Sequence, residues 1–476
     1  MKSSRLAVFA SGLLVVAGCE TVIRAREAQR EAEPKGAGVV AGEGRVDLRG
    51  SSLRQLVDFA MTNRPTVVSA ALAVEDARLA VKELAADAPL VSSTPWLAPK
   101  VSAGGGYSAA SAAATASDLR WKTEGNVSAH LSLDLLVWDF GRHSAQMSAA
   151  AENVVAAEAE LARVCYGVFE DVAAGYFNLL AADALLEVAR TNEHEYAVHL
   201  QYNRERLDSG EAQRLDVTRA QLDLAKARQQ TVAASNSVVT CGAELMRALG
   251  IDADCGTRDD VMPPMCDSMT AAMCAFPSTK YDVETAFELA RTNAPGMAVL
   301  RAKLRAASAR VDYAVADLKP EISASVSLSW TDPLWVWSWG VNAVQSLFQG
   351  FRKTTAVDRA VMQLKSASAA VDEGEQELSR NLELAIANRD NAIEANATAW
   401  KSVLAAKENL DTVKAQFEQG DVSRVDFTDA VNDFATAVGS CISAFYKGQI
   451  CEAYLFALVG RMPEYDERKL TERNLK

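Results

Sequence analysis

The chain contains one long pattern twice, and this duplication constrains the possible fold more than any other feature of the sequence. Adding 210 to a residue number leads from the first copy to the second without a gap, as these pairs show: Trp138 and Phe348, Arg142 and Arg352, Gly210 and Gly420, Asp216 and Asp426, Cys241 and Cys451, Gly250 and Gly460. An offset of 230 aligns 62–65 with 292–295. This period far exceeds the roughly 20–50 residues of solenoid and propeller repeats. Each half should therefore form an entire structural unit, related to the other by a pseudo-twofold axis.

The composition favours long helices and excludes one class of partner. Hydrophobic residues make up 49% of the chain, but aromatic residues only 7%. Such a mixture, carried by Ala, Val and Leu, suits closely packed helices better than a thick aromatic core. The formal net charge of −13 argues against a phosphate-binding surface. We therefore predict no nucleic-acid partner.

The N-terminus has the pattern of a lipoprotein signal peptide, predicted to span 1–18. The small residues before Cys19 resemble the bacterial lipobox, which implies cleavage before that cysteine and a covalent lipid on its thiol, with no other cofactor. The alternative is an ordinary signal peptide that happens to contain a cysteine. Glu20 in place of Asp favours the outer membrane over inner-membrane retention. Residues 19–50, which are charged and contain glycines, would link the lipid to the folded body.

Membrane-spanning strands are predicted in both halves. Nothing beyond the signal peptide offers 18 consecutive apolar residues, so a span must be built from strands. Apolar residues alternate with serines over 321–330, and three tryptophans share one face of 334–346. The segments 99–107 and 126–136 are the corresponding predicted strands of the first half, and 108–122 between them is predicted to be a surface loop. This alternation is typical of transmembrane barrels. Four strands cannot close a barrel, so closure requires further copies of the chain; three copies would give 12 strands.

Uninterrupted helical patterns run over 142–207 and 352–417. At 1.5 Å per residue each helix would reach about 100 Å, longer than an ordinary globular core needs. A second helix should return over 211–249, and a shorter one over 65–87 should lie in line with it. Each half is therefore predicted to be one long helix packed against two shorter ones, next to two strands.

Together these features resemble the TolC-type outer-membrane efflux proteins, specifically their lipid-anchored branch, over about 50–462. The residues that carry the resemblance are the junctions and turns of the two copies: 139–142 and 349–352, 210–216 and 420–426, 249–250 and 459–460. The resemblance implies an α+β membrane protein, with a long α-helical coiled-coil barrel and four β-strands per chain in a trimeric 12-stranded transmembrane β-barrel. It also implies a homotrimer in the outer membrane of a Gram-negative bacterium. Its partners would be a periplasmic adaptor and an inner-membrane pump.

The function implied by the resemblance is passive conduction of drugs, small toxic compounds or metal ions, without catalysis. The exit duct of a type I protein secretion system is an open alternative, as is a non-conducting structural lipoprotein that spans the periplasm. The corresponding segments are a signal peptide, a linker, two repeats joined by a second linker, and a charged tail: 1–18, 19–50, 51–250, 251–281, 282–462 and 463–476.

The candidate aperture consists of Asp426 and Asp429. They are three residues apart and share one face of a helix. Three copies would place six carboxylates around one opening, where they attract cations. Matching aspartates form the innermost constriction in the family. The alternative is that both are ordinary solvated charges.

The candidate gate and adaptor contacts lie around the two turns: Arg206, Leu207, Gly210, Arg214, Asp216, Arg219, Phe417, Gly420 and Val422. One hypothesis is that arginines near the first turn, including Arg204, form salt bridges with the acidic second turn and hold the entrance closed. Exposed charges of little individual effect are the alternative. Val422 stands where the family has a gate arginine.

Two groups could suggest a metal. His194 and His199 resemble a zinc-protease motif, but they are five residues apart instead of four, so we expect an exposed helix surface. Soft sulfur ligands for Cu(I) or Ag(I) could come from the linker between the repeats: Met262, Met265, Cys266 and Cys274. We favour the alternative prediction that two of Cys255, Cys266 and Cys274 form a disulfide. A periplasmic metalloenzyme would rest on these two groups alone, and we predict no metal site and no enzyme.

Overall fold

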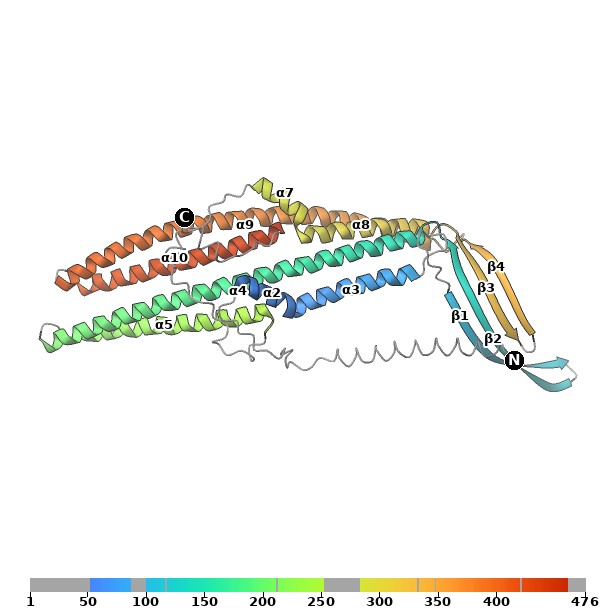
Figure 1. Ribbon diagram of the computed structural model, residues 1–476, viewed down its shortest axis with the longest axis horizontal. Helices are drawn as coiled ribbons and strands as arrows, with labels where there is room; N and C mark the ends of the chain where they lie inside the picture. The colour runs from blue at the N-terminus through green and yellow to red at the C-terminus, as the bar shows by residue number, and fades with distance from the viewer. Residues whose placement is uncertain are drawn as a thin grey trace.

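The computed structural model repeats one order of elements, two helices, two strands and two helices (Figure 1). The structure describes residues 52–86, 100–115, 118–210, 213–251, 283–331, 334–346, 348–419 and 422–460. The first half contains α2 (Leu53–Asn63), α3 (Pro65–Ala86), β1 (Lys100–Thr115), β2 (Asp118–Trp138), α4 (Arg142–Asp208) and α5 (Arg214–Leu249). The second contains α7 (Val283–Asn293), α8 (Pro295–Ala316), β3 (Glu321–Thr331), β4 (Leu334–Val344), α9 (Arg352–Gln419) and α10 (Arg424–Val459). The predicted long helices are confirmed.

The helices form two hairpins that point away from the sheet, α4 with α5 and α9 with α10 (Figure 1). With 67 and 68 residues, α4 and α9 are each about 100 Å long. In one cross-section the neighbours run in the order α5, α4, α10, α9, and nearer the sheet in the order α3, α4, α8, α9. The helices α3 and α5 therefore line up end to end along α4, as the sequence predicts.

Both end-to-end joints place a glycine against a break between two helices. Gly250 ends α5 with a φ of 77°, and Gly460 ends α10 with a φ of 72°. A Cβ on Gly250 would lie 3.2 Å from Cα of Arg64, and one on Gly460 would lie 2.5 Å from the carbonyl oxygen of Asn293. Pro65 and Pro295 begin the next helices at these breaks. The positive φ favours glycine at both joints, and at Gly460 the space also excludes a side chain, whereas at Gly250 the contact would be tight.

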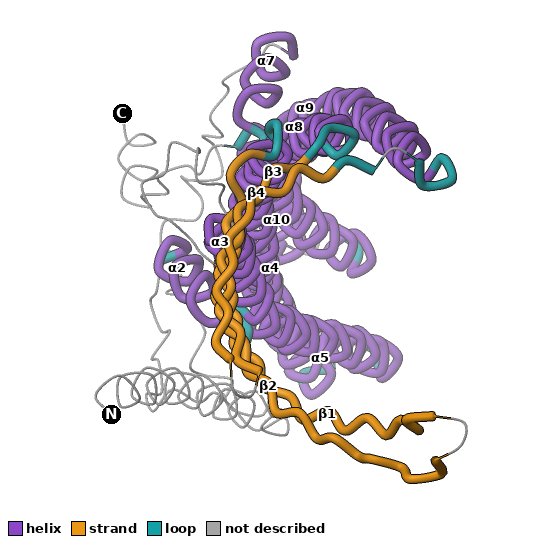
Figure 2. Tube along the Cα trace, turned by 90° about the vertical axis from the view of Figure 1, so that its right-hand side faces the viewer, coloured by secondary structure: helices purple, strands orange, loops and turns teal. Residues whose placement is uncertain are grey.

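The four strands form one antiparallel sheet in the order β1, β2, β3, β4. The sheet and the helices behind it follow the same curve, which is open on one side (Figure 2). Serines face one another across strands: the hydroxyl oxygens of Ser327 and Ser338 are 2.8 Å apart. Trp335, Trp337 and Trp339 are 64%, 71% and 72% exposed, respectively. The predicted alternation is therefore present, and the chain leaves an unpaired edge at β1 and at β4.

The first pair of strands is longer than predicted. The expected surface loop over 108–122 is wrong, because β1 and β2 continue through most of it and pair as far as Thr115 and Asp118. The pairing of β2 with β3 ends at Ser128 and Thr331. Beyond that level β1 and β2 form a two-stranded ribbon that projects past the ends of β3 and β4 (Figure 1).

Ion pairs fix the sheet on the helices. Arg142, the first residue of α4, lies 2.5 Å from Glu321 at the start of β3 and 3.5 Å from Asp317 after α8. Lys353 of α9 lies 3.3 Å from the same Asp317. The first turns of both long helices are thus held at the end of the sheet that lies next to the helices.

Among the described helices, α4 is the one with enough length and apolar character to cross a membrane. Its most apolar stretch of 18 residues has a mean hydropathy of 1.4, and 50% of that stretch is buried inside the chain. Its buried residues include Val172 and Tyr176, which belong to the main core with Leu245 of α5 and Ile442 of α10. A helix that is buried to this extent by other helices of the same chain is typical of a protein core.

Candidate functional site

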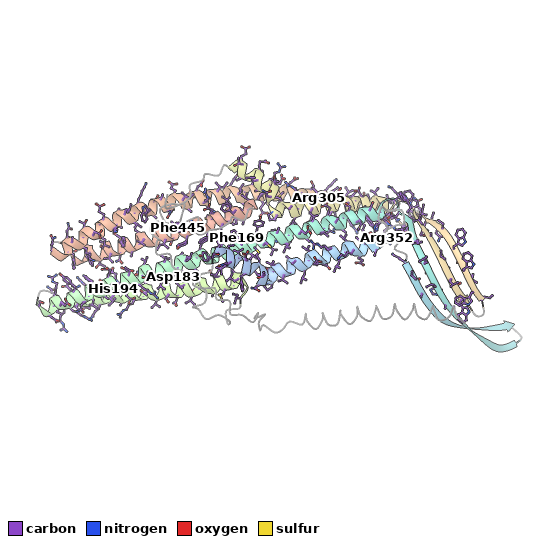
Figure 3. The ribbon with its side chains drawn as sticks, in the orientation of Figure 1. Phe169, Asp183, His194, Arg305, Arg352 and Phe445 are labelled. Atoms are coloured by element: carbon purple, nitrogen blue, oxygen red, sulfur yellow. The ribbon has the colours of Figure 1, made fainter. Side chains whose placement is uncertain are left out.

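The two hairpin tips lie at the end of the molecule farthest from the sheet (Figure 1). In Figure 3, His194 marks α4 toward the tips and Arg352 marks the opposite end, where β4 meets α9. At the first tip α4 ends at Asp208, and Gly210 follows with a φ of 80°. The backbone N–H of Gly210 donates to the carbonyl oxygen of Leu207 at 3.0 Å and closes the last turn. Because the backbone needs a positive φ at this position, glycine is favoured there.

Both helices that leave the tips have an aspartate as their third residue, which accepts a hydrogen bond at the start of the helix. At the first tip, the backbone N–H of Gln213 donates to Oδ2 of Asp216 at 3.2 Å. At the second tip, the hydroxyl of Ser423 donates to Oδ2 of Asp426 at 2.7 Å and accepts from the backbone N–H of Asp426 at 3.3 Å. A carboxylate in the first turn also interacts well with the helix dipole. Asp216 and Asp426 therefore have the same local role in the two repeats.

Asp429 differs from this pair, because Arg219 occupies the matching position of the first repeat. It is exposed on α10, close to the contact between α4 and α10. The hydroxyl of Tyr196 on α4 donates to Oδ1 of Asn432 on α10 at 3.0 Å. Burial raises the pKa of Tyr196 to about 12, and the charges of Asp223 and Asp429 add to the rise. Asp429 thus combines solvent exposure with a position beside the other hairpin.

The arginines of the first tip lie on its surface. The guanidinium of Arg206 lies 5.7 Å from the ring centre of Tyr202. Within the described part of the chain, Arg214 and Arg219 are exposed and pair with no carboxylate. One ion pair between the hairpins near the tips joins Lys414 to Glu195 at 4.0 Å. The described carboxylates of the second tip therefore form no latch with Arg214 or Arg219.

The two histidines lie in different environments. His194 is exposed, as predicted. His199 is only 5% exposed, so the prediction of an exposed surface is wrong for this residue. Its ring packs on Phe417 and Phe427 of the other hairpin. Sequence reasoning missed this, because the residues that bury His199 come from helices more than 200 positions away. Phe417 and Val422 are themselves half-buried.

A groove of about 540 Å³ lies between α4 and α5 near the first tip. Its floor is apolar and its edges carry two arginines and two glutamines, with these lining residues: Ala197, Leu200, Gln201, Arg204, Gln221, Leu224, Ala225 and Arg228. Arg228 pairs with Glu193 at 3.3 Å. The groove offers a surface for an apolar side chain with acidic neighbours.

Several predicted residues fall outside the described ones: Cys19, Gly420, Met262, Met265, Cys266 and Cys274. The described cysteines form no disulfide with one another: Cys165, Cys241, Cys441 and Cys451. No group of three or more metal-binding side chains occurs in the parts of the chain that the structure describes.

Comparisons with known proteins agree with this architecture. The model of the outer membrane efflux protein family matches residues 56–251 and 286–461, which is most of both repeats. A search of curated protein sequences found no match.

Solved structures share the fold at low sequence identity. CusC is 18% identical, with a TM-score of 0.73, over 86% of this chain and 92% of that one. The CmeC outer membrane channel of Campylobacter jejuni is 16% identical, with a TM-score of 0.72, over 89% of each chain. The MtrE outer membrane channel of Neisseria gonorrhoeae, in its open state, is 18% identical, with a TM-score of 0.70, over 86% of this chain and 89% of that one.

The family match extends over both repeats, with their long hairpins and their strands, and family members are outer-membrane channels and not enzymes. The chain therefore belongs to the outer membrane efflux protein family, the trimeric exit channels of tripartite pumps.

Proposed function

We propose that three copies of this chain form a lipid-anchored duct that conducts drugs, small toxic compounds or metal ions from an inner-membrane pump to the cell exterior. The observation that carries the proposal is the exposed Asp429 at the tip of a helical hairpin whose other end joins a four-stranded sheet. The energy would come from the partner pump, since nothing in the described tips is arranged for catalysis. The lipid on Cys19 would anchor each subunit in the outer membrane.

The aperture of the proposed duct depends more on Asp429 than on Asp426. Asp426 is engaged by Ser423, as its counterpart Asp216 is by Gln213. Asp429 has no such partner in the described residues and has an arginine as its counterpart. Three copies of Asp429 around a narrow opening would attract cations and repel anions.

Single-channel conductance in a planar bilayer tests this aperture. Wild-type trimers should open to a small, cation-selective conductance that a polyvalent cation on the tip side blocks. Asp429→Ala should lose the block and most of the selectivity. Asp433→Ala, one turn further along α10 and also exposed, is the matched control. Block that persists in Asp429→Ala would contradict the aperture, and a folded trimer without any conductance would contradict the duct.

The periplasmic adaptor is proposed to contact the first hairpin in the groove between α4 and α5. The groove combines an apolar floor with Arg204 and Arg228, so it suits a helix with an apolar residue between acidic ones. A photo-crosslinking amino acid at Gln201 should capture the adaptor in cells, whereas one at the exposed Glu373 on α9 should not. Equal capture at both positions would contradict this contact.

A further inference from the structure

Four aromatic rings from three helices meet just behind the second tip. The ring of Phe417, near the end of α9, stacks on Phe427, near the start of α10, with ring centres 4.9 Å apart and planes at 22°. His199 of α4 stacks on Phe427 at 5.3 Å and 23° and also contacts Phe417 at 5.6 Å. Tyr202, one turn further along α4, contacts Phe417 at 5.8 Å. We refer to these four side chains as the ring stack.

The ring stack joins the first hairpin to the second. His199 and Phe427 are 5% and 7% exposed, respectively, so their contact excludes water. The side-chain nitrogen of Asn203 lies 3.2 Å from both ring nitrogens of His199 and donates to the carbonyl oxygen of the same residue at 2.8 Å. The stack lies within a buried cluster that also includes Tyr196, Leu200 and Val431.

The ring stack is not a product of the duplication. The positions that match Phe417, Phe427 and His199 at the offset of 210 are Leu207, Val217 and Asn409. None of these is aromatic. The stack therefore exists only where the second hairpin packs against the first, directly beside the aperture candidates on α10.

We propose that the ring stack is the latch that keeps the entrance closed. This inference rests on the proposed function, because it assigns the contact that must break when the second hairpin moves away from the first. Two polar contacts also join the hairpins there: the hydrogen bond of Tyr196 with Asn432, and the ion pair of Lys414 and Glu195, which is 4.0 Å long with side chains 53% and 40% exposed. Exposed pairs of this kind contribute little and are screened by salt. The buried stacking contact of His199 with Phe427 gives the latch a part that ionic strength does not loosen.

Resting conductance of trimers in a planar bilayer tests the latch. Phe417→Ala and Phe427→Ala should each raise the fraction of time spent open about tenfold, which corresponds to about 1.4 kcal/mol, within the range of an aromatic contact. His199→Phe should stay closed, because a second ring can take the place of the imidazole. Val425→Ala, at an exposed position of the same turn, is the matched control. The open fraction of the wild type should not change between low and high salt.

Hydrogen exchange supplies a measure of the latch that needs no conductance. Phe417→Ala should speed amide exchange in 195–207 and in 424–434, but not in 170–185, where the main core lies. If folded trimers of both alanine variants keep wild-type resting conductance and wild-type exchange, the latch is overturned. A wild type that opens as salt rises would also overturn it, in favour of an ion-pair latch. Loss of cation block in Asp429→Ala together with unchanged Phe417→Ala would reject the latch and keep the aperture.

Discussion

At the residue scale, Asp216 and Asp426 allow helix capping to be separated from conduction. Each accepts a hydrogen bond at the start of a helix that leaves a tip. Replacing either by Ala should cost about 1 kcal/mol, the usual effect of a lost cap. The urea midpoint of both variants should fall by a similar amount.

Asp429→Ala provides the control for this comparison, because Asp429 lies beyond the first turn and makes no capping contact in the described residues. Its urea midpoint should match the wild type. A large loss for Asp429→Ala, with none for Asp426→Ala, would contradict the assignment of roles.

Glu170 on α4 should make the stability of the protein depend on pH. Burial raises its pKa, and the neighbouring Asp171, which pairs with Arg64 at 2.6 Å, raises it further. A carboxyl group with a raised pKa binds more protons in the folded state, so stability should increase as pH falls from neutral toward the ordinary value near 4.5. Glu170→Gln should be more stable than the wild type at neutral pH and lose the share of this rise that Glu170 contributes, while Glu452 and Asp183, whose pKa values burial also raises, keep theirs.

Thermal unfolding from pH 7 to pH 5 measures the effect of Glu170. The control is Glu383→Gln, at an exposed position of α9, which should keep the pH dependence of the wild type. A wild type whose melting temperature falls steadily over this range, in parallel with Glu170→Gln, would contradict the prediction.

Residues of the tips could be found from the sequence only where their role is local. The turn glycine at 210 and the aspartates at 216 and 426 can be predicted because capping depends on neighbours within four positions. The ring stack could not, since His199 meets Phe417 and Phe427 only after the two hairpins pack. The pattern around His199 resembles a metal-binding motif, and nothing in it indicates that the ring stacks on phenylalanines.

At the scale of elements, the joints between in-line helices depend on Gly250 and Gly460. An alanine at either position must adopt a positive φ and place its Cβ against the next helix break. We expect Gly460→Ala to cost more than Gly250→Ala, because its Cβ would meet Asn293 at 2.5 Å instead of Arg64 at 3.2 Å. Each should lose at least about 1–2 kcal/mol, which unfolding in urea can measure.

Gly242 gives the matched control for these joints. It lies within α5, and a Cβ there meets nothing within 4 Å. Gly242→Ala should therefore gain about 0.5–1 kcal/mol from helix propensity. If all three alanine variants lost stability equally, the close approach at the joints would not be the cause.

Element lengths were predictable where the sequence lacks breakers. The helices α4 and α9 could be predicted from long stretches without proline, and the duplication supports the prediction because the same pattern occurs in both halves. The length of β1 and β2 was missed, because residues 104–115 are Gly, Ala and Ser with one Tyr and one Thr and show no apolar alternation. Their strand structure comes from pairing with each other, which a single segment does not display.

At the scale of the whole molecule, the open curve of one chain implies where its neighbours bind. The helices α5 and α9 lie at the two ends of the helical arc, as β1 and β4 do for the sheet (Figure 2). Large apolar side chains are exposed on both end helices: Leu215, Leu222, Val232 and Val239 on α5, and Leu384 and Leu404 on α9. Burying these stripes between α5 of one subunit and α9 of the next would close the ring.

The tryptophans of β4 should face lipid in the closed barrel. Trp337→Arg should cost about 2–4 kcal/mol if its position is near the middle of the bilayer, because a charge there is poorly solvated. Fewer trimers should then be recovered from outer-membrane fractions on unheated gels. Ser338→Asn, on the opposite face of the same strand, should assemble as the wild type does. Normal assembly of Trp337→Arg would contradict the lipid-facing assignment.

The ribbon formed by β1 and β2 has a consequence outside the membrane. About 9–11 tilted residues cross a bilayer, and β3 and β4, with 11 residues each, are no longer than that. The strand β2 has 21 residues, and residues 118–127 continue past the last pair with β3. A trimer would raise three such ribbons above the cell surface as a crown. A short peptide tag inserted at the ribbon's turn would then be displayed to antibodies on intact cells, without opening the envelope.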